Sequence, residues 1–294
     1  MKKVLQKYWA WAFVVIPLLL QAIFFYVPMF QGAFYSFTNW TGLTYNYKFV
    51  GLNNFKLLFM DPKFMNAIGF TAIITIAMVV GEIALGIFIA RVLNSKIKGQ
   101  TFFRAWFFFP AVLSGLTVAL IFKQVFNYGL PAIGNALHIE FLQTSLLGTK
   151  WGAIFAAVFV LLWQGVAMPI IIFLAGLQSI PTEITEAARI DGSGEFRTFN
   201  SIVLPLMKPA IAVQAIFTFV ANWNNYFTPA LVLHDDKMKT LPILIAQLRS
   251  ADFLKFDMGQ VYVTIAFSIF PVIIVYLFLS KYIVQGVAMG SVKG

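Results

Sequence analysis

Residues 178–209 read QSIPTEITEAARIDGSGEFRTFNSIVLPLMKP, a polar stretch between two long apolar stretches of the chain. Pro181 suits the first position of a helix, where its missing N–H leaves no hydrogen bond unmade. Glu183 suits the same end, because the helix dipole favours negative charge there, and Gly192 permits the left-handed conformation that often ends a helix. The stretch therefore predicts a short helix over about 181–192.

A second short helix is expected from about Ser193 towards Leu204, where Pro205 stops it. Ala187 and Ala188, in the middle of the first helix, leave a shallow spot that another surface can approach closely. Two interpretations follow from the residues alone. The helices dock onto a partner, or the first one is an amphipathic helix that lies against lipid head groups.

The composition of the whole chain excludes most soluble enzymes. Of the 294 residues, 60% are hydrophobic and only 11% are charged, whereas soluble domains average about 25% charged residues. The net charge of +10 favours basic loops beside a membrane over nucleic-acid binding. The chain has no cysteine, and His138 and His234 lie far apart without a ligand-spaced partner. We therefore expect no catalytic residues and no metal site.

Long apolar stretches predict an all-α integral membrane protein with six transmembrane helices in a single domain over 1–294. Each stretch is long enough to cross a bilayer as a helix. Each is continuously apolar, whereas the strands of a membrane β-barrel alternate. The expected helices run roughly over 9–36, 67–93, 102–126, 151–177, 210–233 and 259–283.

The distribution of basic residues orients these helices. An even number of spans places both termini on one side of the membrane. The short loop after the second span carries Lys96 and Lys98, and basic loops favour the cytoplasm. Both termini and the polar loop 178–209 are then expected to be cytoplasmic.

Polar side chains within the spans are candidates for a solute pathway, because each must face protein or water. Thr218, Asn222 and Asn225 share one helix face, and amides beside aromatic rings suit an uncharged, polyhydroxylated solute such as a sugar. The alternative is interhelical hydrogen bonding and an interfacial aromatic belt. The candidate pathway residues are Gln164, Thr218, Asn222, Trp223, Asn225 and Tyr226.

Glu82 is the only acid within an expected span. It is either a proton or ion site, or a carboxyl paired with a neighbouring helix.

The polar loop resembles the EAA signature of binding-protein-dependent ABC importer permeases. Glu186-Ala187-Ala188 is followed at the family's spacing by Gly192 and by Ile202-x-Leu204-Pro205. The run 177–181, the first outer loop and the tail 285–294 are similar to carbohydrate-uptake permeases related to the maltose permease pair. The resemblance covers nearly the whole chain. Its first half resembles the F-type subunit and its tail the G-type, so the sequence leaves open which half of the pair it is.

The resemblance implies a type I importer (MetI-like) fold in a prokaryotic cytoplasmic membrane. It implies a second permease subunit, a cytoplasmic ATPase dimer and an extracytoplasmic solute-binding protein that delivers a sugar. The chain has no G-x-x-x-x-G-K-[ST] phosphate loop, so no cofactor is expected on it, and ATP and Mg belong to the partner ATPase. By resemblance, the residues that couple to this ATPase are Glu186, Ala187, Ala188, Asp191, Gly192, Ile202, Leu204 and Pro205.

Two other classes compete with an importer permease. A secondary carrier or channel for a small neutral solute predicts several charges within the spans and no ordered cytoplasmic loop. An intramembrane enzyme predicts His, Asp, Cys or Ser clustered at membrane depth. The sequence shows neither pattern, and a non-enzymatic transport subunit remains the expected function.

Overall fold

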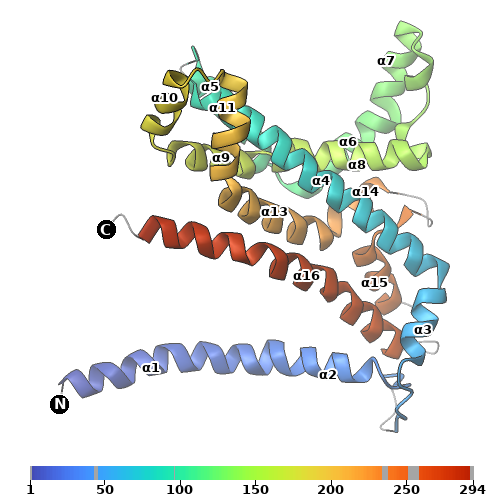
Figure 1. The fold of residues 1–294 in the computed structure, drawn as a ribbon. Coiled ribbons are helices and arrows are strands. Elements are labelled where there is room, and N and C mark those ends of the chain that lie inside the picture. The colour runs from blue at the N-terminus through green and yellow to red at the C-terminus, as the bar shows by residue number, and fades with distance from the viewer. Residues whose placement is uncertain (1, 43–45, 96, 234–237, 251–257, 292–294) are drawn as a thin grey trace. The chain divides into compact units, whose positions relative to one another are not determined.

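A computed structural model describes residues 2–42, 46–95, 97–233, 238–250 and 258–291. The described chain is helical (Figure 1), apart from turns and one antiparallel bridge between Thr38 and Phe49. It divides into two compact units. The first comprises Met1–Met65 and Ile245–Phe270, and the second comprises Asn66–Leu244 and Pro271–Gly294. The single domain over 1–294 stays a prediction.

The helices begin and end as follows, with π-helical and 3-10 turns labelled η. The N-terminal elements are α1 (Lys2–Gln21), η1 (Ala22–Tyr26), α2 (Val27–Tyr35), α3 (Asn53–Met60), α4 (Pro62–Asn94) and α5 (Gln100–Val112). The middle elements are α6 (Gly115–Gln124), η2 (Val125–Gly129), α7 (Leu130–Leu137), η3 (Glu140–Leu142), η4 (Leu146–Gly148), α8 (Lys150–Gly165) and α9 (Ala167–Gln178). The remaining elements are α10 (Thr182–Ile190), α11 (Glu195–Thr198), η5 (Phe199–Val203), α12 (Leu204–Leu206), α13 (Lys208–Trp223), α14 (Phe227–Val232), α15 (Leu241–Ser250) and α16 (Met258–Ser291).

In the first unit, polar and aromatic contacts order the loop after α2. The amide of Asn54 donates hydrogen bonds to the backbone oxygens of Ser36 and Thr38, at 2.9 and 2.8 Å. The ring of Tyr35 stacks on Trp40, with 4.1 Å between the centroids. Buried backbone carbonyls need such donors where no helix supplies them.

Among the residues that the structure describes, four helical stretches are long and apolar enough to span a membrane, and two bent pairs bring the number to as many as six. This agrees with the predicted all-helical membrane fold. The four single stretches are Phe13–Tyr35, Pro62–Asn94, Gly115–Leu137 and Met258–Tyr282. The pair Lys150–Gly165 and Ala167–Gln178 bends by 51°, and the pair Glu195–Leu206 and Lys208–Trp223 bends by 67°.

Two expected spans are wrong in their limits. The stretch 210–233 is not continuous, because α13 ends at Trp223 and α14 begins at Phe227. The stretch 102–126 is not a single helix, because the backbone is extended at Leu113 and Ser114. The spanning helix starts at Gly115 and continues to Leu137. The break is tolerated because the side chain of Gln164 donates a 3.0 Å hydrogen bond to the freed Leu113 carbonyl.

In the second unit, α4 packs closely on α8 and α9. A side chain at Gly81 would meet Leu162 at 2.9 Å, and one at Gly86 would meet Pro169 at 2.6 Å. Small residues of this kind let membrane helices approach closely. The ring of Phe173 on α9 is fully buried in the resulting core.

Candidate functional site

The first helix of the polar loop, α10, has the ends that the sequence predicts. Pro181 directly precedes it in an extended conformation, and Gly192 lies beyond its end with φ of +76°. The Gly192 N–H donates to the Arg189 carbonyl at 3.0 Å, and the Ser193 N–H donates to the Ala188 carbonyl at 2.9 Å. These two bonds form a Schellman motif, which satisfies carbonyls that the helix leaves free.

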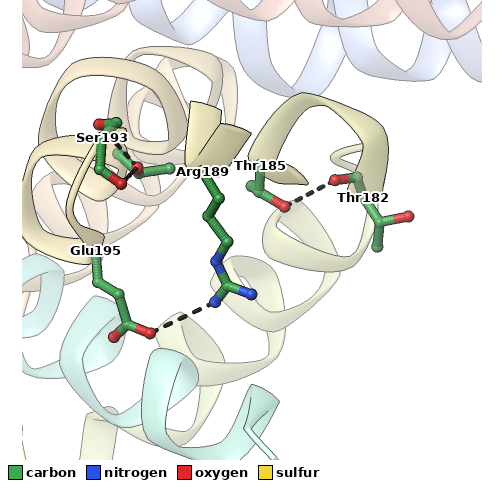
Figure 2. Close-up of polar contacts among 6 residues, drawn as sticks. Thr182, Thr185, Arg189, Ser193 and Glu195 are labelled. Carbon is green, nitrogen blue, oxygen red and sulfur yellow. Dashed lines mark hydrogen bonds and ion pairs between the residues drawn. The ribbon is translucent and has the colours of Figure 1, made fainter. Parts of the chain in front are cut away.

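Side-chain contacts join α10 to the segment that follows it (Figure 2). Arg189 reaches from α10 to Glu195 at the start of α11, with 3.4 Å between Nη2 and Oε1. Thr198 donates a 3.0 Å hydrogen bond to the Ser193 hydroxyl in the turn. The polar loop is therefore an ordered helix–turn–helix unit, residues 182–206, which we call the α10–α12 segment.

The outer face of α10 is free in this chain. Ala188 is buried, whereas Glu186, Ala187, Asp191 and Gly192 are exposed. Two large apolar side chains lie on the surface of the same segment: Ile190 is 85% exposed and Phe196 is 77% exposed. Large apolar side chains that are exposed together are typical of a surface that binds another protein or a membrane.

The second half of the segment continues further than expected. Helical structure runs over Glu195–Leu206 without a stop at Pro205. Proline has no N–H to donate to the Ser201 carbonyl, and the chain widens just before it into the π-turn η5, where the Leu204 N–H donates to Phe199. Ile202 and Leu204 are half-buried, and Pro205 is exposed.

Sequence reasoning missed the residues that anchor this segment. Val203 and Met207 are buried with Ala90 of α4 and Phe173 of α9 in one hydrophobic cluster. Their spacing of four residues was a usable signal, because it places them on one helix face. The α10–α12 segment therefore has a free outer surface and an inner end embedded in the helix bundle.

The candidate pathway residues of α13 lie inside the protein. Thr218, Asn222 and Trp223 are 2%, 9% and 4% exposed. The Asn222 amide donates a 2.9 Å hydrogen bond to the Thr218 backbone oxygen, and the Trp223 ring stacks on Phe219. In this conformation the three side chains make internal contacts.

The other candidate pathway residues lie at breaks in the helices. The Asn225 side-chain oxygen accepts a 3.3 Å hydrogen bond from the Thr228 N–H, in the gap between α13 and α14. Tyr226 is in the same gap and is 40% exposed. Gln164 donates its hydrogen bond to the Leu113 carbonyl at the break between α5 and α6. The predicted set is therefore split between α13, the gap after it, and α8.

Glu82 is paired with a neighbouring helix, one of the two interpretations left open. Its Oε2 accepts hydrogen bonds from Thr218 Oγ1 at 2.5 Å and from Gln214 Nε2 at 3.2 Å. Gln214 Nε2 also contacts Thr218 Oγ1 at 2.8 Å. All three side chains are buried.

A cavity of about 300 Å³ lies among α4, α5 and α8, and its lining includes Trp106, Pro110 and Trp163. Every lining side chain is apolar, apart from the indole N–H groups. A sugar needs several hydrogen-bonding partners where it is held. This cavity therefore lacks the polar groups that would hold a sugar.

The family follows from comparison with known sequences. A family described as "Binding-protein-dependent transport system inner membrane component" matches residues 82–289, which include the whole α10–α12 segment. The chain belongs to this family. It is a membrane component of a binding-protein-dependent importer, and the predicted class is confirmed.

Individual relatives agree with this assignment. The chain is 68% identical over 225 residues to the multiple sugar-binding transport system permease protein MsmF of Streptococcus mutans, with 76% of this chain and 78% of the relative covered. It is 33% identical to the probable starch degradation products transport system permease protein AmyD of Thermoanaerobacterium thermosulfurigenes, with 74% of each chain covered.

A solved structure supports the fold. A chain of a bacterial ABC transporter involved in the import of the acidic polysaccharide alginate superimposes with a TM-score of 0.76. The match covers 97% of this chain and 98% of the other at 18% sequence identity. The all-helical importer-permease fold is therefore confirmed.

Proposed function

We propose that this permease carries a neutral sugar or oligosaccharide across the cytoplasmic membrane, together with a second permease subunit. An extracytoplasmic binding protein delivers the solute, and a cytoplasmic ATPase dimer, which holds ATP and Mg, supplies the energy. The observation that carries the proposal is the free outer face of α10, set on an ordered segment whose inner end is buried in the bundle. The names of the sugar-transporting relatives support the solute class.

The α10–α12 segment is suited to transmit a movement of the docked ATPase to the membrane helices. Glu186 offers a charge to the partner, and Ala187 lets the partner surface come close. Gly192 holds the turn in a conformation that other residues adopt only with strain. Val203 and Met207 pass a displacement to α4 and α9, because close-packed cores move as bodies.

The remaining members of the proposed coupling set lie around the same turn. Asp191 caps the end of α10. Ile202, Leu204 and Pro205 shape the helix that leads back to the bundle. The orientation follows from the function: the segment and both termini lie in the cytoplasm, where the ATPase binds.

We assign the solute pathway to the polar face of α13 and to the gap after it. Asn225 and Tyr226 offer an amide and a half-exposed ring, the combination that sugar hydroxyls and sugar faces require. Thr218, Asn222, Trp223 and Gln164 would reach solute only after their internal contacts rearrange in another conformation. Glu82 is not assigned to the pathway, because its carboxyl is hydrogen-bonded to the neighbouring helix α13.

The test is reconstitution of the full complex in proteoliposomes with the binding protein outside and ATP inside. We expect uptake of a radiolabelled oligosaccharide that requires the ATPase subunit, the binding protein and hydrolysable ATP. Uptake by vesicles that contain the permease without any ATPase would instead indicate a secondary carrier or channel. A complex that hydrolyses ATP but accumulates only a charged solute would contradict the sugar assignment.

A further inference from the structure

The carboxyl of Glu82 lies where three membrane helices of the second unit meet. Glu82 itself is on α4 and is 6% exposed. Its Oε2 accepts both hydrogen bonds from α13, from Gln214 and Thr218. Charged or strongly polar groups within a membrane span are costly unless they are paired. The two hydrogen bonds therefore tie α4 to α13 at this depth.

The third helix approaches through Gly165, the last residue of α8. A side chain added at Gly165 would lie 2.6 Å from Glu82 Oε1 and 3.6 Å from Glu82 Cδ. No other atom outside its own helix backbone and chain neighbours lies within 4 Å of that position in the described chain. The glycine thus leaves a space that the Glu82 carboxyl occupies, directly before the 51° bend between α8 and α9.

The Gln214 amide is oriented by this carboxyl. Its nitrogen donates to both Glu82 and Thr218, while its oxygen is buried without a hydrogen-bond partner among the described residues. A buried, unpaired acceptor is unfavourable. The amide keeps this orientation because Glu82 and Thr218 both accept from its nitrogen.

Two of the three helices, α8 and α13, are connected along the chain to the α10–α12 segment. α9 follows the bend at Gly165 and leads into α10, and α13 follows α12. Two helices, α9 and α13, therefore lead from the α10–α12 segment into the bundle, and we call them the two arms. The Glu82 carboxyl lies against Gly165, directly before the first arm, and accepts hydrogen bonds from the middle of the second. α9 and α13 also touch directly, since a side chain at Gly176 would meet Ala210 at 3.2 Å.

We propose that Glu82 is a positioning residue that holds the α8–α9 bend and α13 together, so that displacement of α10 moves both arms as one body. This inference rests on the proposed coupling role of α10. Loss of the contacts that Glu82 makes lets one arm move without the other. ATP hydrolysis then yields less transport. The quantity that reports on Glu82 is the amount of sugar taken up per ATP hydrolysed.

Substitutions of Glu82 separate its hydrogen bonding from its volume. Glu82→Gln keeps the shape and an oxygen that accepts from Thr218, and we expect its uptake per ATP to stay within about twofold of the parent. Glu82→Leu removes the acceptor, and we expect a loss of roughly tenfold. Normal uptake per ATP in an assembled Glu82→Leu complex would overturn the proposal.

A second pair of variants remains decisive if Glu82→Leu does not assemble. Gly165→Ala pushes a methyl group into the carboxyl, and Glu82→Asp withdraws the carboxyl by one methylene. Each alone is expected to lower uptake per ATP. The double variant is expected to lose less than the product of the two single losses, because the shorter side chain leaves room for the methyl group. Independent losses that multiply would overturn the proposal.

Gly69→Ala is the matched control, since Gly69 is also a helical glycine, on α4. In the described chain, no atom outside its own helix backbone and chain neighbours lies within 4 Å of a side chain added there. We expect it to transport normally. Failure of the proposed function is distinguishable, because the unmodified complex would then show no ATP-dependent uptake. Failure of the Glu82 proposal leaves that uptake intact and removes only the effects of the variants.

Discussion

The guanidinium carbon of Arg91 lies 4.5 Å from the centroid of the Phe199 ring. Arg91 is in the last turn of α4, and Phe199 is the first residue of the π-turn η5 in the α10–α12 segment. A cation over an aromatic face is attracted by the ring quadrupole. This contact gives the segment a second attachment to α4, besides the buried cluster around Val203 and Met207.

Arg91→Ala is expected to weaken the attachment of the segment by about 0.5–1 kcal/mol, the usual value of an exposed cation–π pair. Phe199→Leu is expected to have a similar effect, and the double variant should add little to either single one. Thermal unfolding of the purified permease measures the coupling between the two sites. Additive effects of Arg91→Ala and Phe199→Leu would show that the pair does not interact.

Gly192→Val is expected to uncouple ATP hydrolysis from transport. At φ of +76° a residue with a side chain is strained by about 1–2 kcal/mol, even though an added Cβ meets no atom of the described residues, other than its chain neighbours, within 4 Å. The strain distorts the Schellman turn, which places α10 relative to α11. Uptake and co-purification of the ATPase measure the effect.

Gly194→Ala is the control for that substitution, because Gly194 also has open space around it but an ordinary negative φ of −67°. We expect it to behave like the parent protein. If Gly192→Val left both uptake and ATPase association unchanged, the turn would have no part in coupling.

Arg189→Ala is expected to change stability by less than about 1 kcal/mol. The Arg189 and Glu195 side chains are 68% and 76% exposed, so water and salt screen their attraction. Backbone hydrogen bonds at Gly192 and Ser193 hold the turn without the ion pair. A shift in the unfolding midpoint as large as that of a core truncation such as Met207→Ala would contradict this expectation.

Asn225→Ser separates capping of α14 from contact with solute. A serine hydroxyl can still accept from the Thr228 N–H, so the stability should change little, whereas the amide donor is lost. If Asn225 meets sugar, uptake falls severalfold at subsaturating binding protein while the unfolding midpoint stays the same. Normal uptake kinetics would confine Asn225 to a role in helix capping.

Local features of the candidate site were predictable from the sequence. The Schellman turn at Gly192 depends on hydrogen bonds between residues at most five positions apart. Proline and glycine at the two ends of α10 act through their own backbones. The membrane class was equally accessible, because a deficit of charge over the whole chain needs no knowledge of contacts.

Hydropathy predicted where the apolar stretches lie, but it did not predict where the helices within them break. The expected helix over 102–126 is interrupted at Leu113, where the freed carbonyl accepts a hydrogen bond from Gln164, a side chain 51 positions away. The sequence places Thr218 and Asn222 on one polar helix face. Whether its partners are solute or protein depends on which helices pack against it.

By itself, the sequence determined that this chain spans a membrane and carries a short helix with a glycine turn, since composition and neighbouring residues suffice for both. Only the tertiary structure decided which groups the carboxyl of Glu82, on α4, contacts. Glu82 and Thr218 are 136 positions apart, and the space for the carboxyl comes from a glycine on a third helix. Such a junction exists only when close packing brings the three helices together, because no local pattern records which helix faces which.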